Sequence, residues 1–78
     1  MPLDKIISII SEQLNVPKEK INEASRFSED LGADSLDIFQ IITELEDEFG
    51  LEFSNEALDS IRTVGDAAEY AKTKLGEK

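Results

Sequence analysis

The chain has 78 residues, of which 18 are Asp or Glu and 8 are Lys or Arg, and it contains no His, Cys or Trp. This length predicts one small domain over residues 1–78, and a hydrophobic content of 40% is too high for a disordered acidic tail. The formal charge of −10 disfavours nucleic acid and membrane surfaces, and the lack of Cys and His excludes disulfides, thiolate chemistry and the commonest general base and zinc ligand.

The first element expected is an amphipathic helix over residues 3–14. Its apolar stripe consists of Leu3, Ile6, Ile7, Ile10 and Leu14. Pro2 suits the first turn, and the sequence Asn15-Val16-Pro17 ends the helix because proline cannot continue the hydrogen-bond ladder. Residues 18–33 carry mixed charge and few apolar anchors, so we expect a long loop that holds at most a short turn of helix.

A second helix is expected over residues 36–49. Asp34 and Ser35 are N-cap residue types, Asp37 lies in the first turn, and Gly50 suits the C-terminal stop. The arc expected to face the core consists of Ile38, Ile41, Ile42, Leu45 and Phe49. The opposite arc consists of Leu36, Gln40, Thr43 and Asp47, flanked by Asp37, Glu44, Glu46 and Glu48. The outward face is therefore acidic, with an exposed leucine near its start.

Two further helices complete the chain. Ser54 can cap a short helix over residues 55–60, and Thr63 with Asp66 resembles a capping box that opens the last helix, which continues to Gly76. The apolar positions of this last helix are Val64, Ala67, Ala68, Ala71 and Leu75. No segment shows the alternation of a strand. The predicted fold class is therefore all-α, a small four-helix bundle of three long helices and one short one, with a long loop between the first two.

The segment from Asp30 to Asp37 places a serine, Ser35, at the mouth of the second helix. Free backbone N–H groups and the helix dipole favour a phosphate there, and Gly32 allows the preceding loop to turn tightly. The alternative is that Ser35 or Asp34 is only an N-cap, and spacing alone favours that interpretation because Ser and Asp lead the N-cap ranking.

Residues 27–37, Phe-Ser-Glu-Asp-Leu-Gly-Ala-Asp-Ser-Leu-Asp, resemble the signature of acyl carrier proteins. In that family the serine of Asp-Ser-Leu receives a 4′-phosphopantetheine arm from coenzyme A. The later helices follow the family's order, so the resemblance covers nearly the whole chain. It implies that a phosphopantetheinyl transferase attaches the arm to Ser35 with Mg²⁺, and that Asp34 lies near that metal. The chain then needs no catalytic residue of its own, because the arm supplies the thiol.

The resemblance also implies a docking surface for fatty acid synthesis enzymes that carry basic patches. The candidate docking residues are Leu36, Asp37, Gln40, Glu44, Glu46, Asp47 and Phe53. For any single carboxylate, an ordinary solvated surface is an equally open interpretation. Gln40 and Thr43 stand where many bacterial members carry Glu and an apolar residue, so a specialised polyketide or modified-lipid pathway also stays open.

Members of the family pack their acyl chains between helices. Candidates to line such a space are Phe39, Ile42, Leu45, Phe53, Leu58, Ile61 and Ala67, although an ordinary core role is the commoner one for each in a small helical domain.

An acidic chain also suggests a calcium loop, but the twelve-residue pattern starting at Asp30 fails, because it needs Gly where Ser35 stands and Glu where Ile41 stands. We expect no resident metal. Without a bilayer-length apolar stretch or an N-terminal leader pattern, we expect a cytoplasmic monomer with no membrane insertion. A non-carrier interpretation also remains, in which the chain is an acidic helical adaptor for basic proteins with an unmodified Ser35.

Overall fold

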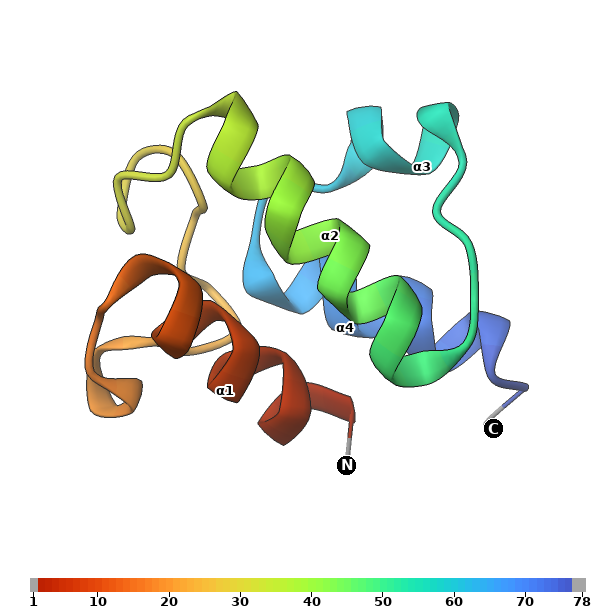
Figure 1. The fold of residues 1–78 in the computed structure, drawn as a ribbon, viewed down its shortest axis with the longest axis horizontal. Helices are drawn as coiled ribbons and strands as arrows, with labels where there is room; N and C mark the ends of the chain where they lie inside the picture. The colour runs from red at the N-terminus through yellow and green to blue at the C-terminus, as the bar shows by residue number, and fades with distance from the viewer. Residues whose placement is uncertain (1, 77–78) are drawn as a thin grey trace.

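The computed structural model describes residues 2–76, which form a bundle of helices joined by loops (Figure 1). The elements are α1 (Pro2–Leu14), the 3₁₀ turn η1 (Lys18–Lys20), α2 (Ser35–Phe49), α3 (Asn55–Ser60) and α4 (Val64–Lys74). Within the described range, β pairing is limited to one antiparallel bridge between Arg26 and Thr63. The predicted all-α class is confirmed, with three long helices, one short helix and a long loop between α1 and α2.

Both ends of α2 are set by the residues that the sequence indicates. Asp34 is the N-cap, and its side chain accepts a hydrogen bond from the backbone N–H of Asp37. At the other end, Gly50 has φ 65°, a left-handed conformation that glycine adopts without a Cβ clash, and its N–H donates to the Glu46 carbonyl oxygen. The helix therefore starts and stops at defined residues.

The remaining helix ends also follow local chemistry. Ser54 caps α3, and Thr63 with Asp66 forms the predicted capping box at the start of α4. α1 ends through Asn15, which has φ 57°, while Val16 donates to the Ser11 carbonyl oxygen at 3.2 Å. Pro17 therefore follows a helix that has already ended.

The core lies where α1 packs against both α2 and α4 (Figure 1). Its buried apolar side chains are Ile6, Ile10, Ile21, Phe27, Ala33, Ile41, Ile42, Leu45, Phe53, Val64, Ala67 and Ala71. The predicted inner arc of α2 is thus confirmed at its centre, while Ile38 and Phe49 lie at its partly exposed margins. Burial of large aliphatic side chains of this kind stabilises by about 1.5–3 kcal/mol each.

The long loop is tied to the start of α4. The Phe27 N–H donates to the Arg62 carbonyl oxygen at 3.1 Å, and the Val64 N–H donates to the Ser25 carbonyl oxygen at 3.0 Å. The Phe27 ring is 1% exposed and anchors the loop in the core. This loop leads directly into α2, so its attachment to α4 fixes the direction from which the chain enters Ser35.

Candidate functional site

Ser35 is the first residue of α2, and its side chain is exposed. The capping hydrogen bonds at this end are made by Asp34 and Asp37, so the Ser35 hydroxyl takes no part in them. The N-cap role that the sequence left open between Ser35 and Asp34 belongs to Asp34. The hydroxyl lies at the positive end of the helix dipole, where an attached phosphate is electrostatically favoured.

The loop that precedes Ser35 is held by short-range hydrogen bonds. Ala33 is 4% exposed, and its N–H donates to the Phe27 carbonyl oxygen at 2.8 Å. The Ser28 hydroxyl donates to the Ala33 carbonyl oxygen at 3.3 Å. Gly32 has φ 69°, so the expectation that this glycine permits a tight turn is confirmed. The serine is therefore presented from a defined loop conformation.

Arg26 organises the outer side of the same loop. Its guanidinium pairs with Glu29 at 3.0 Å and with Asp30 at 3.2 Å, and its backbone N–H donates to Asp30 Oδ2 at 2.9 Å. The hydrogen bonds from Arg26 hold the pKa of the Asp30 carboxyl below its usual value, and the same contact raises the pKa of Arg26. Both pairs are solvent-exposed and contribute little to stability.

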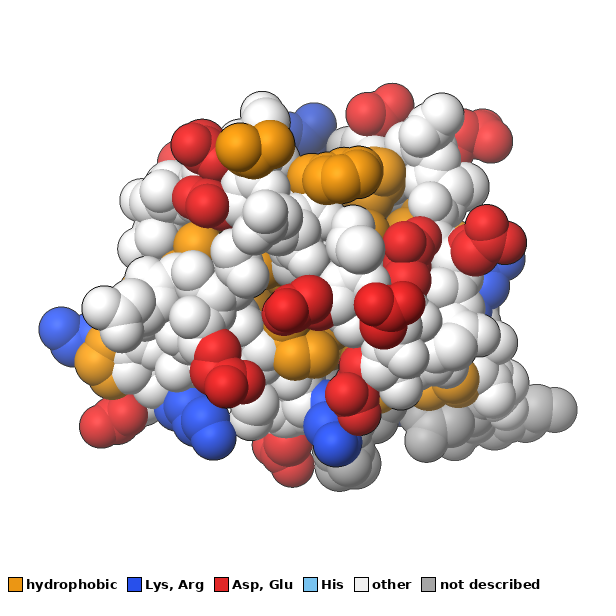
Figure 2. Space-filling model, viewed as in Figure 1, with side chains coloured by type: hydrophobic (Ala, Val, Ile, Leu, Met, Phe, Trp, Pro, Cys, Tyr) orange, Lys and Arg blue, Asp and Glu red, His pale blue; other side chains and the backbone are white. Residues whose placement is uncertain are grey.

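The predicted docking residues fall into two groups. Leu36, Gln40, Glu44 and Asp47 are exposed along α2. Figure 2 shows acidic side chains over α2 and the adjoining part of α1, with hydrophobic surface near the start of α2. The Gln40 side-chain oxygen accepts a hydrogen bond from the Gln13 amide of α1 at 2.6 Å. These four residues form one continuous outward face.

Asp37 and Glu46 are partly buried and already engaged within the chain. Asp37 closes the capping box, and Glu46 Oε2 accepts a hydrogen bond from the Phe53 N–H at 2.8 Å. Glu46 therefore ties the end of α2 to the loop before α3. Its carboxylate is less free to meet a partner than those of Glu44 and Asp47.

The structure agrees with the core role expected for Phe53 and not with its expected docking role. This side chain is 7% exposed, and its ring centroid lies 4.6 Å from that of Tyr70. The Tyr70 hydroxyl donates to the Glu52 carbonyl oxygen at 3.1 Å, which closes the loop over the two rings. Phe53 is a core residue with almost no surface to offer a partner, because the aromatic pair draws it inward.

Sequence reasoning missed Phe39, which is 64% exposed. It was expected to lie in the core or to line a cargo space. At 100° per residue, Phe39 lies one-third of a turn from the central buried residue Leu45, at the margin of the apolar arc, so periodicity alone does not decide its burial. The proximity of a second exposed apolar residue, Leu36, was the pattern that could have indicated a surface role.

The other cargo-lining candidates belong to the core or its edge. Ile42, Leu45 and Ala67 are buried, while Leu58 and Ile61 are partly exposed. Beside the start of α2 lies a small cavity of about 160 Å³, lined by Phe27, Ser28, Glu29, Ile38, Ile61 and Arg62.

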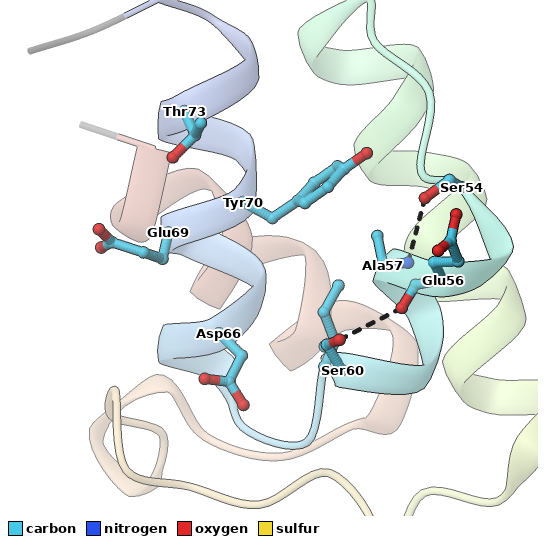
Figure 3. Close-up of a pocket in the computed structure, with 9 residues that line it drawn as sticks. Ser54, Glu56, Ala57, Ser60, Asp66, Glu69, Tyr70 and Thr73 are labelled. Carbon is cyan, nitrogen blue, oxygen red and sulfur yellow. Dashed lines mark hydrogen bonds between the residues drawn. The ribbon is translucent and has the colours of Figure 1, made fainter.

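A larger groove of about 530 Å³ runs between α3 and α4 (Figure 3). Tyr70 and Ala57 face it, and the Ser54 hydroxyl accepts from the Ala57 N–H at its edge. α3 has no buried residue, and its Leu58 packs partly buried against the core. The groove is open to solvent, so it differs from the enclosed space that a sheltered acyl chain would need.

Among residues 2–76, no three acidic side chains are grouped so that they could hold a metal ion. No helix in the same range combines the length and apolar character needed to cross a membrane.

Comparison with known proteins gives concordant results. Residues 4–71 match the family model described as the phosphopantetheine attachment site. The solved structure of the acyl carrier protein from Enterococcus faecalis is 36% identical, with a TM-score of 0.79, and the match covers 92% of this chain and 91% of that chain. A Mycobacterium tuberculosis protein assigned as an acyl carrier protein is 36% identical, with a TM-score of 0.82 and coverage of 96% and 97%.

Proposed function

The chain belongs to the acyl carrier proteins, which are carriers and not enzymes, and from this premise we propose that it carries growing acyl chains on Ser35 for fatty acid synthesis. The covalent prosthetic group of the family is 4′-phosphopantetheine. The observation that supports Ser35 as its attachment point is an exposed hydroxyl at the first residue of α2, between the cap Asp34 and the exposed Leu36.

Ser35 acts in this proposal as an acceptor. Its Oγ forms a bond to the phosphorus on the pantetheine side of the coenzyme A diphosphate, the P–O bond within the diphosphate breaks, and adenosine 3′,5′-bisphosphate leaves. In this proposal a base of the transferase takes the hydroxyl proton, since this chain has no His to take it. The N-terminal end of α2 then stabilises the phosphodiester charge.

Asp34 is proposed to act at the same step. One carboxylate oxygen, Oδ1, accepts the capping hydrogen bond from the Asp37 N–H at 2.9 Å. Oδ2 lies outside that hydrogen bond, so it can face the Mg²⁺ that the transferase brings with coenzyme A. The cap holds the carboxylate next to Ser35 before the partner arrives, which lowers the cost of ordering it on binding.

The family interacts with a phosphopantetheinyl transferase and with synthesis enzymes in general. For this chain we propose that Glu44 and Asp47 meet basic patches on those enzymes and that Leu36 adds an apolar contact, supported by the exposure of all three on one face of α2. Exposed charges of this kind mainly raise the rate of encounter and set specificity. Gln40 belongs to the same face, and its side-chain oxygen accepts a hydrogen bond from the Gln13 amide of α1.

We also propose that residues 1–78 form a single carrier domain that acts as a cytoplasmic monomer. The support for a monomer is electrostatic, because two chains that each carry a formal charge of −10 repel each other at close range. Sedimentation at low and moderate salt concentration measures this directly.

The pathway is tested by reconstitution. The chain, loaded with its arm, is incubated with malonyl transferase and the elongation enzymes of fatty acid synthesis, and the acyl species on the chain are measured by mass. We expect stepwise lengthening by two carbons. If these enzymes leave the chain unextended while a polyketide ketosynthase extends it, the specialised pathway that Gln40 and Thr43 leave open replaces fatty acid synthesis.

A further inference from the structure

The groove between α3 and α4 has an apolar floor (Figure 3). Ala57 of α3 and Ile61, which follows α3, line it from one side, and Tyr70 projects from α4 toward α3. All three side chains are partly exposed. Part of this apolar surface is therefore open to a molecule that enters the groove.

The two walls of the groove have the dimensions of a short helix. The α3 wall runs from Ser54 to Ile61 and the α4 wall runs from Asp66 to Thr73, seven positions apart in each case. A helix rises 1.5 Å per residue, so seven positions span about 10 Å. This length corresponds to about two turns of a further helix lying between the walls.

The rim of the groove is acidic. Glu56 lies on the α3 wall, and Asp66 and Glu69 lie on the α4 wall. Among the described residues that line the groove, none is Lys or Arg, and no ion pair between described residues includes Glu56 or Glu69. The Lys74 Nζ lies 5.6 Å from the Tyr70 ring centroid, so this side of α4 accommodates a cationic side chain.

The groove is separate from the proposed attachment site. All the described residues that line it belong to α3, to α4 or to the two positions that flank α3. The lining includes no residue of α2 and none of the loop that leads to Ser35. An occupant of the groove therefore need not cover Ser35 or the outward face of α2.

Charge and shape distinguish the possible occupants. An acyl chain brings no charge to meet the acidic rim, and the groove leaves it open to water. A second copy of this chain carries another −10, which opposes its approach. An amphipathic helix with Lys or Arg beside its apolar stripe matches both features, because the stripe meets the floor and the cations meet the rim.

We propose that the groove between α3 and α4 binds a basic amphipathic helix of a partner protein, at a second interface that leaves Ser35 and the outward face of α2 free. The bound segment is about two turns long, with apolar side chains on Ala57 and Tyr70 and cations beside Glu56 and Glu69. Such an interface holds the carrier while another enzyme acts at α2. It needs no arm on Ser35, so it is independent of the proposed attachment.

The test uses the full chain, unmodified at Ser35, and a synthetic amphipathic peptide of about 14 residues with Leu at helical spacing and Lys on the flanks. A titration at low ionic strength, followed by NMR amide shifts, gives both the binding site and Kd. We expect the largest shifts at Ala57, Tyr70 and Thr73, and small shifts along the outward face of α2. A peptide with Glu in place of each Lys should bind at least about tenfold more weakly.

Two pairs of substitutions separate the rim from the general charge. Glu56→Gln with Glu69→Gln removes two rim charges, whereas Asp59→Asn with Glu19→Gln removes the same charge from exposed positions outside the groove. We expect the rim pair to raise Kd about fivefold and the control pair to raise it about twofold at most. Ala57→Gln places a polar side chain on the floor and should also raise Kd. Melting temperatures close to native show that each variant is folded.

Several results overturn the proposal. Largest shifts on the outward face of α2, or equal losses in the rim and control pairs, reduce the binding to general charge attraction. Equal affinity of the acidic peptide removes the role of the rim. Groove shifts on loading an octanoyl chain, with the peptide displaced, assign the groove to cargo, and groove shifts that grow with the concentration of the chain alone assign it to a second copy. Absence of shifts at about 1 mM basic peptide rejects the interface.

Discussion

Asp34 and Asp37 cap the start of α2 reciprocally. The Asp37 N–H donates to Asp34 Oδ1 at 2.9 Å, and the Asp34 N–H donates to Asp37 Oδ2 at 3.3 Å. Asp34 thus combines a structural role, seen in these hydrogen bonds, with the proposed role beside the transferase Mg²⁺. Because Asn also caps helices but carries no charge, a pair of substitutions can separate the two roles.

We predict that Asp34→Ala lowers the free energy of unfolding by about 1 kcal/mol through loss of the cap, whereas Asp34→Asn stays close to native. If the carboxylate also faces Mg²⁺, both variants load more slowly than the native chain. Urea unfolding and initial loading rates measure the two effects separately. Native loading by Asp34→Asn would restrict Asp34 to capping.

The pH dependence of stability should include a contribution from Asp66. The Arg62 N–H donates to Asp66 Oδ2 at 3.0 Å and the Thr63 N–H donates to it at 3.1 Å, and these bonds hold the Asp66 pKa below its usual value of 3.8. A carboxyl whose pKa is lower in the folded state stabilises the fold above its unfolded pKa. That contribution is lost as the pH falls through the folded pKa.

We therefore predict that the stability difference between the native chain and Asp66→Asn is present near neutral pH and shrinks as the pH falls below 3.8. Asp59→Asn removes the same charge from an exposed position of α3 and serves as the control. Urea unfolding over a pH series gives the difference at each pH. A difference that grows toward acid would contradict the sign of the Asp66 shift.

Gly65 should not tolerate a side chain. A Cβ there would lie 2.9 Å from the Glu23 carbonyl oxygen, the same atom that accepts a hydrogen bond from the Gly65 N–H at 2.9 Å. We predict that Gly65→Ala lowers the free energy of unfolding by about 1–3 kcal/mol, because the loop must move away from α4. Alanine favours a helix over glycine by about 1 kcal/mol. If Gly65→Ala were more stable than the native chain, the loop at Glu23 would be able to move away from α4 at little cost, and the prediction would be wrong.

Salt should stabilise this chain. The formal charge is −10, so the acidic side chains repel one another in the folded state. Salt at 0.1 M reduces the range of that repulsion to about 10 Å. We predict a higher melting temperature in added NaCl and a larger rise with Mg²⁺ at equal ionic strength, measured by circular dichroism. A melting temperature independent of both salts would contradict the electrostatic account.

Local chemistry made the helix boundaries predictable. Ser54, the Thr63 and Asp66 pair, and Gly50 act within a few residues of themselves, so the sequence alone indicates their roles, and the structure confirms them. The exposure of Leu36 was equally predictable, because Leu36 lies on the arc of α2 opposite the core.

Features set by distant segments were not predictable in this way. The choice between the core and docking roles expected for Phe53 depends on its contact with Tyr70, seventeen positions later, and on the Glu46 carboxylate that accepts from its N–H. The exposure of Phe39, at the margin of the apolar arc of α2, depends on which segments pack beside that margin. The bridge between Arg26 and Thr63 joins two loops with no pattern of alternation. Each of these outcomes depends on tertiary packing that no local periodicity encodes.

The central claim is that Ser35 carries the prosthetic arm. The most direct measurement is the intact mass of the chain before and after incubation with coenzyme A, Mg²⁺ and a broad-specificity phosphopantetheinyl transferase, with Ser35→Ala treated in parallel. We predict one phosphopantetheinyl increment on the native chain and none on Ser35→Ala. A native chain that stays unmodified while a control carrier is loaded, or an increment that persists on Ser35→Ala, would contradict the claim.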